Sequence, residues 1–225
     1  MPLLPKELSD KIIKEFVEDD TYLIGHSVSE PRGMTEVLLF YEPGGFDTYA
    51  ERKGDEYTIN GTKAYCSTAP VAKAIFVEVR TDRKGPLTKS WSGFFIPVGT
   101  PGFTIGKLHN HAGFRMLQTC ELAFEDVRVP ASHLVGKENG FCDSFKMAQV
   151  VVLVFKMSTL LGVYRALYDE AVNYARTRVV CGKPIIQHDT VKYMLADMRM
   201  KIAAARSLVH EVAWSFDHHP ERAKE

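Results

Sequence analysis

The sequence predicts an α+β protein, in which an antiparallel β-barrel or sandwich is followed by two long antiparallel helices of an incomplete helical bundle. From about residue 21 to 129, short segments of alternating apolar and polar residues are separated by glycine and proline. From about residue 139 to 223, apolar residues recur at helical spacing. The two patterns meet in Phe114–Gly136, where a strand is expected to break at Asp126 and Val129-Pro130 is expected to form an extended turn.

Charge and hydropathy exclude several partners. The 225 residues contain 28 Lys and Arg and 28 Asp and Glu, so the net charge is zero and gives no reason to expect nucleic acid or an anionic membrane. The most apolar run, Val150–Phe155, is closed by Lys156 and is too short to span a bilayer. We therefore predict no membrane contact. The cysteines are widely spaced without a CxxC pair, which favours reduced thiols in a cytosolic protein: Cys66, Cys120, Cys142 and Cys181.

Residues 1–20 are predicted to form one helix, the tail of a missing N-terminal helical domain. Ser9 or Asp10 is a possible cap. A helix this short is marginal in water and must dock on another element, and the sequence offers no earlier helix. The apolar residues at helical spacing are Leu8, Ile12, Ile13, Phe16 and Val17.

Residues 21–136 are predicted to form the β domain. Gly54-Asp55 and Asn60-Gly61 are hairpin signals, because both dipeptides suit positive backbone angles. Many short strands at this spacing suggest a sandwich or a closed barrel, and periodicity does not decide between them. The expected strands are Leu23–Val28, Glu36–Tyr41, Tyr49–Lys53, Glu56–Ile59, Thr62–Ser67, Ala74–Arg80, Trp91–Pro97, Phe103–Ile105 and Glu121–Phe124.

Residues 137–225 are predicted to form the first half of a C-terminal helical bundle. One helix is expected to start near Gly140, and Asp189 or Thr190 is expected to cap a second helix after a polar loop, Thr177 to His188. Two antiparallel helices cannot bury both sides of their apolar stripes. They therefore need more helices or another subunit.

Residue types alone indicate little chemistry. His109-x-His111 lacks a third ligand at a recognisable spacing, which argues against a metal site. No GxSxG, glycine-rich phosphate loop or HExxH motif is present. Hydroxyls at strand ends can bind a heteroaromatic ligand or satisfy turn backbone, and composition favours neither: Ser27, Ser29, Ser67 and Thr68.

A series of short motifs nevertheless resembles the acyl-CoA dehydrogenase family over about residues 20–215. None is specific alone, and the resemblance rests on their order and spacing. The motifs are SVSEP (27–31), GDEYTINGTK (54–63), TPGF (100–103), GFR (113–115), FEDVRVP (124–130), LVG (134–136) with GF (140–141), Arg178 with GKP (182–184), and LADM (195–198).

The resemblance implies a fold and a cofactor. The family has an N-terminal helical domain, a middle β-barrel and a C-terminal four-helix bundle, with FAD between barrel and bundle and a dimeric or tetrameric assembly. This chain resembles the barrel and the first two bundle helices. We therefore expect a homo-oligomer or a missing partner segment, in the cytoplasm or, in a eukaryote, the mitochondrial matrix.

The resemblance also implies site residues. Val28 and Ser29 match residues at the flavin pyrimidine edge, Tyr65 an aromatic packed on the isoalloxazine, and Ser67 a hydroxyl that bonds flavin N5. Thr35 matches a serine near the acyl-CoA. A further match, Arg178, corresponds to an arginine that reaches the FAD pyrophosphate of a neighbouring subunit.

Departures from the family pattern limit the expected activity. Cys181 and Asp189 replace the usual phenylalanine and glutamine, and Asp189 would bring a negative charge near FAD. The family removes an α-proton with a glutamate base, which usually lies beyond the position of Glu225 or, in some members, at the position of Val152. We expect no catalytic residue in this chain, and therefore no competent dehydrogenase from it alone.

Two classes of function remain. The first is an FAD-dependent acyl-CoA dehydrogenase, incomplete here, that uses an acyl-CoA substrate and, by family inference, an electron-transfer flavoprotein. The second is a non-catalytic homologue that binds flavin or acyl-CoA. An acyl-CoA oxidase or flavin monooxygenase of the same fold is a further alternative. The sequence does not define acyl chain length or branching.

Overall fold

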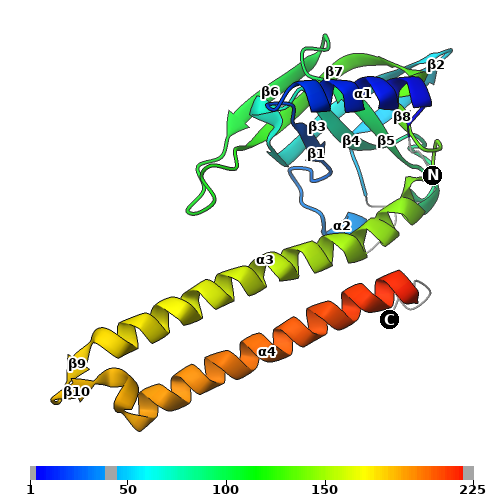
Figure 1. Cartoon of the computed structure of the whole chain (residues 1–225). Coiled ribbons are helices and arrows are strands. Elements are labelled where there is room, and N and C mark those ends of the chain that lie inside the picture. The colour runs from blue at the N-terminus through cyan, green and yellow to red at the C-terminus, as the bar shows by residue number, and fades with distance from the viewer. Residues whose placement is uncertain (1–3, 39–44, 220–225) are drawn as a thin grey trace. The chain divides into compact units, whose positions relative to one another are not determined.

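The computed structural model describes residues 4–38 and 45–219 and contains two compact units, Met1–Ser144 and Phe145–Glu225. The first is a mixed β unit and the second is helical, which confirms the predicted α+β class (Figure 1). The strands of the β unit are β1 (Ile24–Ser27), β2 (Tyr49–Lys53), β3 (Glu56–Ser67), β4 (Ala74–Arg80), β5 (Trp91–Pro97), β6 (Phe103–Leu108), β7 (Thr119–Pro130) and β8 (Leu134–Val135).

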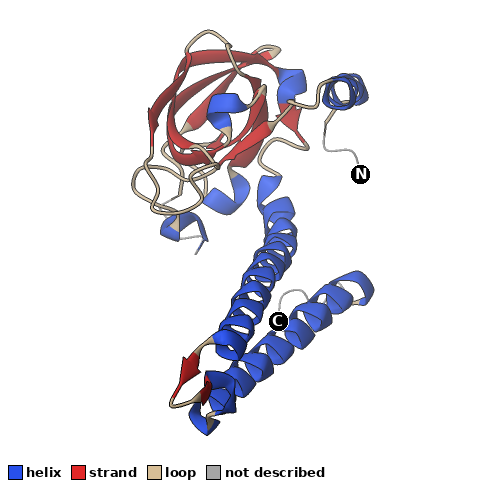
Figure 2. Ribbon diagram, turned by 60° about the vertical axis from the view of Figure 1, so that its left-hand side comes forward, coloured by secondary structure: helices blue, strands red, loops and turns tan. Residues whose placement is uncertain are grey.

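The eight strands form one curved sheet (Figure 2). Its order is β6-β7-β3-β1-β4-β5-β8, and β2 pairs with both β3 and β4. Both β1 and β2 pair with β3 and with β4, β1 near one end of these two strands and β2 near the other, so β1 and β2 lie in line between β3 and β4 (Figure 2). Most pairs are antiparallel, whereas β1 and β2 run parallel to β4. The alternating residues turned inward form a continuous apolar core that includes Ile59, Ile75, Val77, Phe94, Ile96 and Leu122.

Two expected boundaries are wrong for related reasons. The Asn60-Gly61 turn does not exist, because β3 runs unbroken through it. Gly61 instead allows close approach, since a Cβ there would lie 2.6 Å from the Cα of Thr48. The break at Asp126 is also absent, and β7 continues to Pro130. A β-bulge in β7 accommodates Asp126 at a φ of 50°. The side chain of Asn60 holds Asp126 there: its Oδ1 accepts the Asp126 N–H at 2.8 Å, and its Nδ2 donates to the Asp126 carboxylate at 3.1 Å.

The expected strand Glu36–Tyr41 is also wrong where the structure describes it. Thr35–Leu38 forms a short helix, α2, and the remaining positions lie outside the described residues. The N-terminal helix α1 spans Lys6–Glu18, with Pro5 rather than Ser9 or Asp10 at its N-cap. Its Ile12 belongs to a small apolar cluster with Tyr22, which precedes β1, and with three residues of the sheet: Ala74, Phe95 and Val135.

The helical unit is a long hairpin. Helix α3 (Phe141–Thr177) starts one residue after Gly140, and α4 (Asp189–His218) runs antiparallel to it in both views (Figures 1 and 2). The connection contains two short strands, β9 (Val179–Val180) and β10 (Lys183–Pro184), joined by Cys181-Gly182 with both φ angles positive. The N-cap of α4 is His188 without a side-chain cap bond, so the expected caps Asp189 and Thr190 are wrong.

Most apolar side chains of the helical unit are exposed, including Phe155, Met157, Leu160 and Leu167. Within α3, the stretch Val151–Thr177 is long and apolar enough to cross a membrane by length and composition alone, which the sequence analysis did not expect. The core helix of a helical bundle meets the same criterion.

Candidate functional site

Tyr65 is turned outward by a β-bulge in β3. The pairing with β7 runs Lys63↔Leu122 and then Cys66↔Cys120, so β3 carries one extra residue between these pairs. Tyr65 occupies the left-handed region at a φ of 58°. Its side chain is 58% exposed, and its ring stacks on His109 with centroids 5.0 Å apart. The bulge therefore presents an aromatic face at the barrel surface.

Val28 and Ser29 lie beside this bulge. The N–H of Ala64 donates to the carbonyl of Ser29 at 2.8 Å, which fixes Ser29 against the residue that precedes Tyr65. Both Val28 and Ser29 are half-buried. Two elements of the predicted site, one before β2 and one in β3, therefore meet at one place on the barrel.

Ser67 ends β3 at the same junction. It pairs in register with His26 of β1 on one side and with Thr119 of β7 on the other. Its carbonyl accepts the hydroxyl of Thr68 at 2.6 Å. Ser67 is half-buried, so its side chain is partly open to a ligand. Four of the predicted site residues thus gather where β1 meets the end of β3.

The other two predicted residues lie elsewhere in the chain. Thr35 is the exposed first residue of α2, after the turn closed by the bond from Gly33 N–H to the Glu30 carbonyl. Arg178 belongs to the helical unit and follows α3 directly. Its N–H donates to Tyr174 and its carbonyl accepts from Ile185, so its backbone is fixed in the connection while its side chain is exposed.

Sequence analysis missed a buried ion pair next to these residues. Lys63 Nζ lies 2.9 Å from Glu30 Oε1 and donates to the Val28 carbonyl at 3.1 Å. The side chains are 0% and 4% exposed. An available signal was the position of Lys63, which the alternation of β3 turns toward the interior. Charged residues are rarely fully buried unless they are paired, which directs attention to the glutamate before Pro31.

The Glu30 carboxylate is surrounded by donors. Oε1 accepts the N–H of Thr48 at 2.9 Å, and Oε2 accepts the N–H of Asp47 at 2.7 Å. Burial alone would raise the pKa of Glu30, but the Lys63 ammonium and these N–H groups outweigh it, so the pKa lies below its ordinary value. Burial lowers the pKa of Lys63, against the opposing effect of Glu30.

A second buried carboxylate lies on β4. Glu78 is fully buried, and its Oε1 contacts Nε2 of the half-exposed His26 at 2.5 Å. The His26 ring also stacks on Phe76, with centroids 5.4 Å apart. The contact between His26 and Glu78 thus links β1 to β4 at the residue of β1 that pairs with Ser67.

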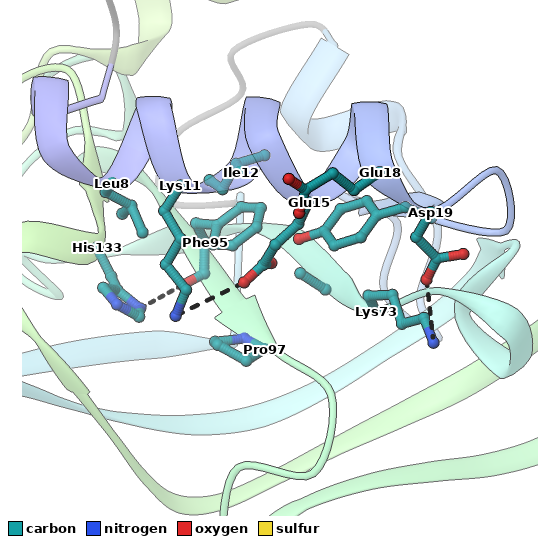
Figure 3. A pocket seen from close by; sticks show the side chains of 12 residues that line it. Leu8, Lys11, Ile12, Glu15, Glu18, Asp19, Lys73, Phe95, Pro97 and His133 are labelled. Atoms are coloured by element: carbon teal, nitrogen blue, oxygen red, sulfur yellow. Dashed lines mark hydrogen bonds and ion pairs between the residues drawn. The ribbon is translucent and has the colours of Figure 1, made fainter.

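A separate cavity of about 520 Å³ lies between α1 and the sheet (Figure 3). The side chains of Lys11 and Lys73 approach Glu15 and Asp19 at 3.9 and 3.7 Å. The ring of His133 contacts the Phe95 carbonyl at 2.9 Å, and burial lowers the pKa of His133. None of the predicted site residues lines this cavity.

The structure offers no support for a histidine metal site. The rings of His109 and His111 lie 6.3 Å apart. Within residues 4–38 and 45–219, no group of three or more His, Cys, Asp or Glu side chains is placed to hold a metal ion. In the structure the four cysteines are thiols that form no disulfide with one another, and burial raises the pKa of Cys66 to about 11.

Comparison with known proteins assigns the family. The acyl-CoA dehydrogenase middle-domain profile matches residues 28–127, and the C-terminal-domain profile matches residues 155–225. The chain belongs to the acyl-CoA dehydrogenase family. The second match also identifies the long apolar helix α3 as part of the family's helical domain.

Individual relatives agree with this assignment. The chain is 36% identical over 186 residues to the short-chain-specific acyl-CoA dehydrogenase of Megasphaera elsdenii, covering 80% of this chain and 47% of the relative. The solved butyryl-CoA dehydrogenase of the same organism has a TM-score of 0.82 at 31% identity, over 94% of this chain and 53% of that one. A structure described as PigA with FAD and proline shares the fold, with a TM-score of 0.86 at 22% identity over 96% and 54%. The chain spans about half the length of these relatives.

Proposed function

We propose that this chain provides the flavin-binding barrel and part of the helical domain of an FAD-dependent acyl-CoA dehydrogenase, a cytoplasmic oxidoreductase. The observation that carries this proposal is the bulge in β3, which turns Tyr65 outward and bonds Ala64 N–H to the Ser29 carbonyl. An exposed aromatic face beside half-buried hydroxyls suits a flat, heteroaromatic ligand. The residues present therefore fit FAD.

Each residue has a distinct role in this proposal. Tyr65 packs on the isoalloxazine, and Val28 and Ser29 bind its pyrimidine edge. Ser67 would provide a hydroxyl donor to the flavin and so favour negative charge on the ring. FAD, when bound, supplies the acceptor for the hydride that leaves the β-carbon of an acyl-CoA. Thr35 lies near the acyl-CoA, and Arg178 contributes a charge-assisted contact to the pyrophosphate of FAD in a second copy of the chain.

The charge of Asp189 does not prevent this role. Its carboxylate lies 2.9 Å from Lys192 Nζ, and this hydrogen bond and charge hold the pKa of Asp189 below its ordinary value. Lys192 therefore offsets a negative charge that would otherwise weaken binding of the FAD phosphates. Because both groups are exposed, the offset is partial.

Proton abstraction is a separate matter. Val152 occupies the position at which some family members have the glutamate base, and a valine side chain cannot accept a proton. We propose that residues 1–225 bind FAD but do not remove the α-proton of an acyl-CoA. An electron-transfer flavoprotein is the proposed electron acceptor of the complete enzyme.

The visible spectrum of the purified chain, with and without added FAD, tests this proposal. We expect saturable binding of FAD with a perturbed flavin absorbance, and no bleaching when butyryl-CoA is added under anaerobic conditions. Bleaching would contradict the assignment of Val152 and reveal a base elsewhere in the chain. A colourless protein that binds no FAD would contradict the flavin proposal and favour a non-flavin homologue.

A further inference from the structure

The buried pair Lys63–Glu30 joins three segments of the barrel. Lys63 belongs to β3, and Glu30 to the segment after β1. The Glu30 carboxylate accepts the N–H groups of Asp47 and Thr48, which precede β2. Lys63 Nζ also lies 4.0 Å from the centre of the Phe46 ring, so a cation–π contact adds to the ion pair.

The same pair contacts or adjoins the two residues of the proposed flavin edge, Val28 and Ser29. Lys63 holds the carbonyl of Val28 at 3.1 Å, and Glu30 follows Ser29 directly. Lys63 also stands two residues before Tyr65, on the strand whose Ala64 N–H binds the Ser29 carbonyl. The segment 28–30 is therefore fixed at each residue: Val28 by Lys63, Ser29 by Ala64, and Glu30 by three donors.

Stability alone does not explain such an arrangement. Removing two charges from water opposes folding, and a well-packed apolar pair often stabilises a core as well or better. A buried network in which every group is satisfied instead specifies one conformation. The carboxylate of Glu30 and the ammonium of Lys63 meet this condition, because both have several partners at hydrogen-bond distance.

We propose that Lys63 and Glu30 are positioning residues that hold Val28 and Ser29 against the Ala64–Tyr65 bulge and thereby set the flavin edge. The flavin part of this inference rests on the proposed function. Neither side chain reaches the ligand in this proposal, since both are buried. They act through the backbone of Val28 and Ser29 and through the orientation of Tyr65. In metal sites, groups that orient a ligand without touching the metal typically change affinity by about 10- to 100-fold, and we expect an effect at the lower end of that range here.

The first test measures amide hydrogen exchange in the full chain without flavin. The variant K63M/E30Q removes both charges together, so no buried charge is left unpaired. The quantity measured is the ratio of the exchange rate of the Ala64 amide to that of the Ile59 amide, which lies toward the other end of β3. We expect this ratio to rise at least about tenfold in the double variant, because the Ser29 carbonyl no longer holds the Ala64 N–H. An unchanged Ala64-to-Ile59 ratio would overturn the inference.

Val127→Ala is the matched control. Val127 is fully buried and pairs with Ile59, so its truncation loosens the barrel away from the Ser29 junction. We expect this variant to accelerate Ile59 without raising the ratio for Ala64. If V127A raised that ratio as much as K63M/E30Q does, the effect would be general loosening and the proposal would fail.

The second test measures the dissociation constant of FAD for the same proteins. We expect it to rise about tenfold in K63M/E30Q and to stay within about twofold of the wild type in V127A. Wild-type affinity in the double variant would overturn the positioning role. Failure of the wild-type chain itself to bind FAD would instead contradict the proposed function, and the exchange ratio would still decide whether the pair holds Ser29 in place.

Discussion

The two units of this chain bury their apolar side chains to different extents. The β unit encloses a continuous core in which Ile59, Ile75, Val77, Phe94 and Ile96 are fully buried. In the helical unit, the buried side chains among those that the structure describes are Phe145, Ala175 and Ile202. Apolar side chains along α3 and α4 line open grooves instead, such as the one formed by Leu153, Met157 and Leu208.

The difference lies in where the packing partners are. Strands far apart in sequence, such as β3 and β7, pair with each other and enclose an apolar core within residues 1–144. Two antiparallel helices cover only one side of each other's apolar stripes. The β unit should therefore respond strongly to single core substitutions, while the helical unit should respond weakly until its faces are covered.

A matched pair of phenylalanines gives the largest expected contrast. Phe94 is fully buried with its ring 4.7 Å from that of Tyr57, whereas Phe155 of α3 is 73% exposed. We expect Phe94→Ala to lower the free energy of unfolding by about 3–5 kcal/mol and Phe155→Ala by less than about 0.5 kcal/mol.

The two tryptophans make this contrast measurable. Trp91 is buried in the β unit and Trp214 lies exposed on α4, so in a Trp214→Phe background fluorescence reports on the barrel. Urea unfolding of Phe94→Ala in that background, followed by fluorescence, and of Phe155→Ala, followed by the loss of helical circular dichroism, gives the two losses. Equal losses at Phe94 and Phe155 would contradict the comparison.

Removing one partner of the buried ion pair has the next largest effect. Lys63→Met leaves the Glu30 carboxylate buried without its ammonium, and we expect the free energy of unfolding to fall by about 3 kcal/mol. Adding Glu30→Gln should restore part of this loss. The exposed pair Lys73–Asp19 is the control, and Lys73→Ala should change the same quantity by less than about 1 kcal/mol. A Lys63→Met loss no larger than that of Lys73→Ala would refute the prediction.

The pKa of Glu30 gives the β unit a specific acid sensitivity. Because this pKa lies below its ordinary value in the folded state, the unfolded chain binds more protons as the pH falls. The stability from Glu30 is therefore present above the unfolded pKa, near the ordinary value of 4.5, and is lost as the pH falls through the lower folded value.

Urea midpoints measured from pH 7 to pH 3 by Trp91 fluorescence test this sign. We expect the wild type to lose stability toward pH 3 more steeply than Glu30→Gln, which has no carboxylate to protonate at this position. Identical pH dependence in the two proteins would show that Glu30 does not contribute.

The smallest effect is expected on the surface of the helical unit. Lys201 Nζ lies 2.7 Å from the Asp197 carboxylate one turn earlier on α4, and both side chains are largely exposed. Lys201→Ala should lower stability by about 0.3–0.5 kcal/mol, measured from the thermal loss of helical circular dichroism. Repeating the measurement in 1 M salt should remove most of the difference, and a loss that persists there would indicate packing of the lysine stem instead.

Local patterns predicted much of the fold. Gly54-Asp55 joins β2 and β3 as a hairpin with Lys53 opposite Glu56, and three strands begin and end where alternation predicts. The pattern failed at Asn60-Gly61 and Asp126. Gly61 allows the close approach of Thr48, and Asp126 lies in a β-bulge of β7, so neither forms a turn. Those requirements come from a facing strand, so a single segment cannot reveal them.

The candidate site was predictable only through the resemblance to a family. Short motifs led us to predict Ser29, Tyr65 and Ser67 as flavin-binding residues, and this role stays a prediction. No periodic pattern indicates that β1 and the end of β3 meet. The Lys63–Glu30 pair was missed because hydrophobic periodicity carries no information on which buried charges find partners. That information lies in the placement of both β1 and β2 between β3 and β4.

The most direct test of the central proposal compares two equally exposed aromatics. Tyr65 and Phe16 are both 58% exposed, but only Tyr65 belongs to the proposed flavin edge. Titration of the full chain with FAD, followed by flavin fluorescence, should give a dissociation constant about tenfold higher for Tyr65→Ala, since an aromatic stack contributes about 0.5–1.5 kcal/mol. Phe16→Ala should bind as the wild type does. Equal affinity of the two variants and the wild type would contradict the assignment of Tyr65 to the flavin.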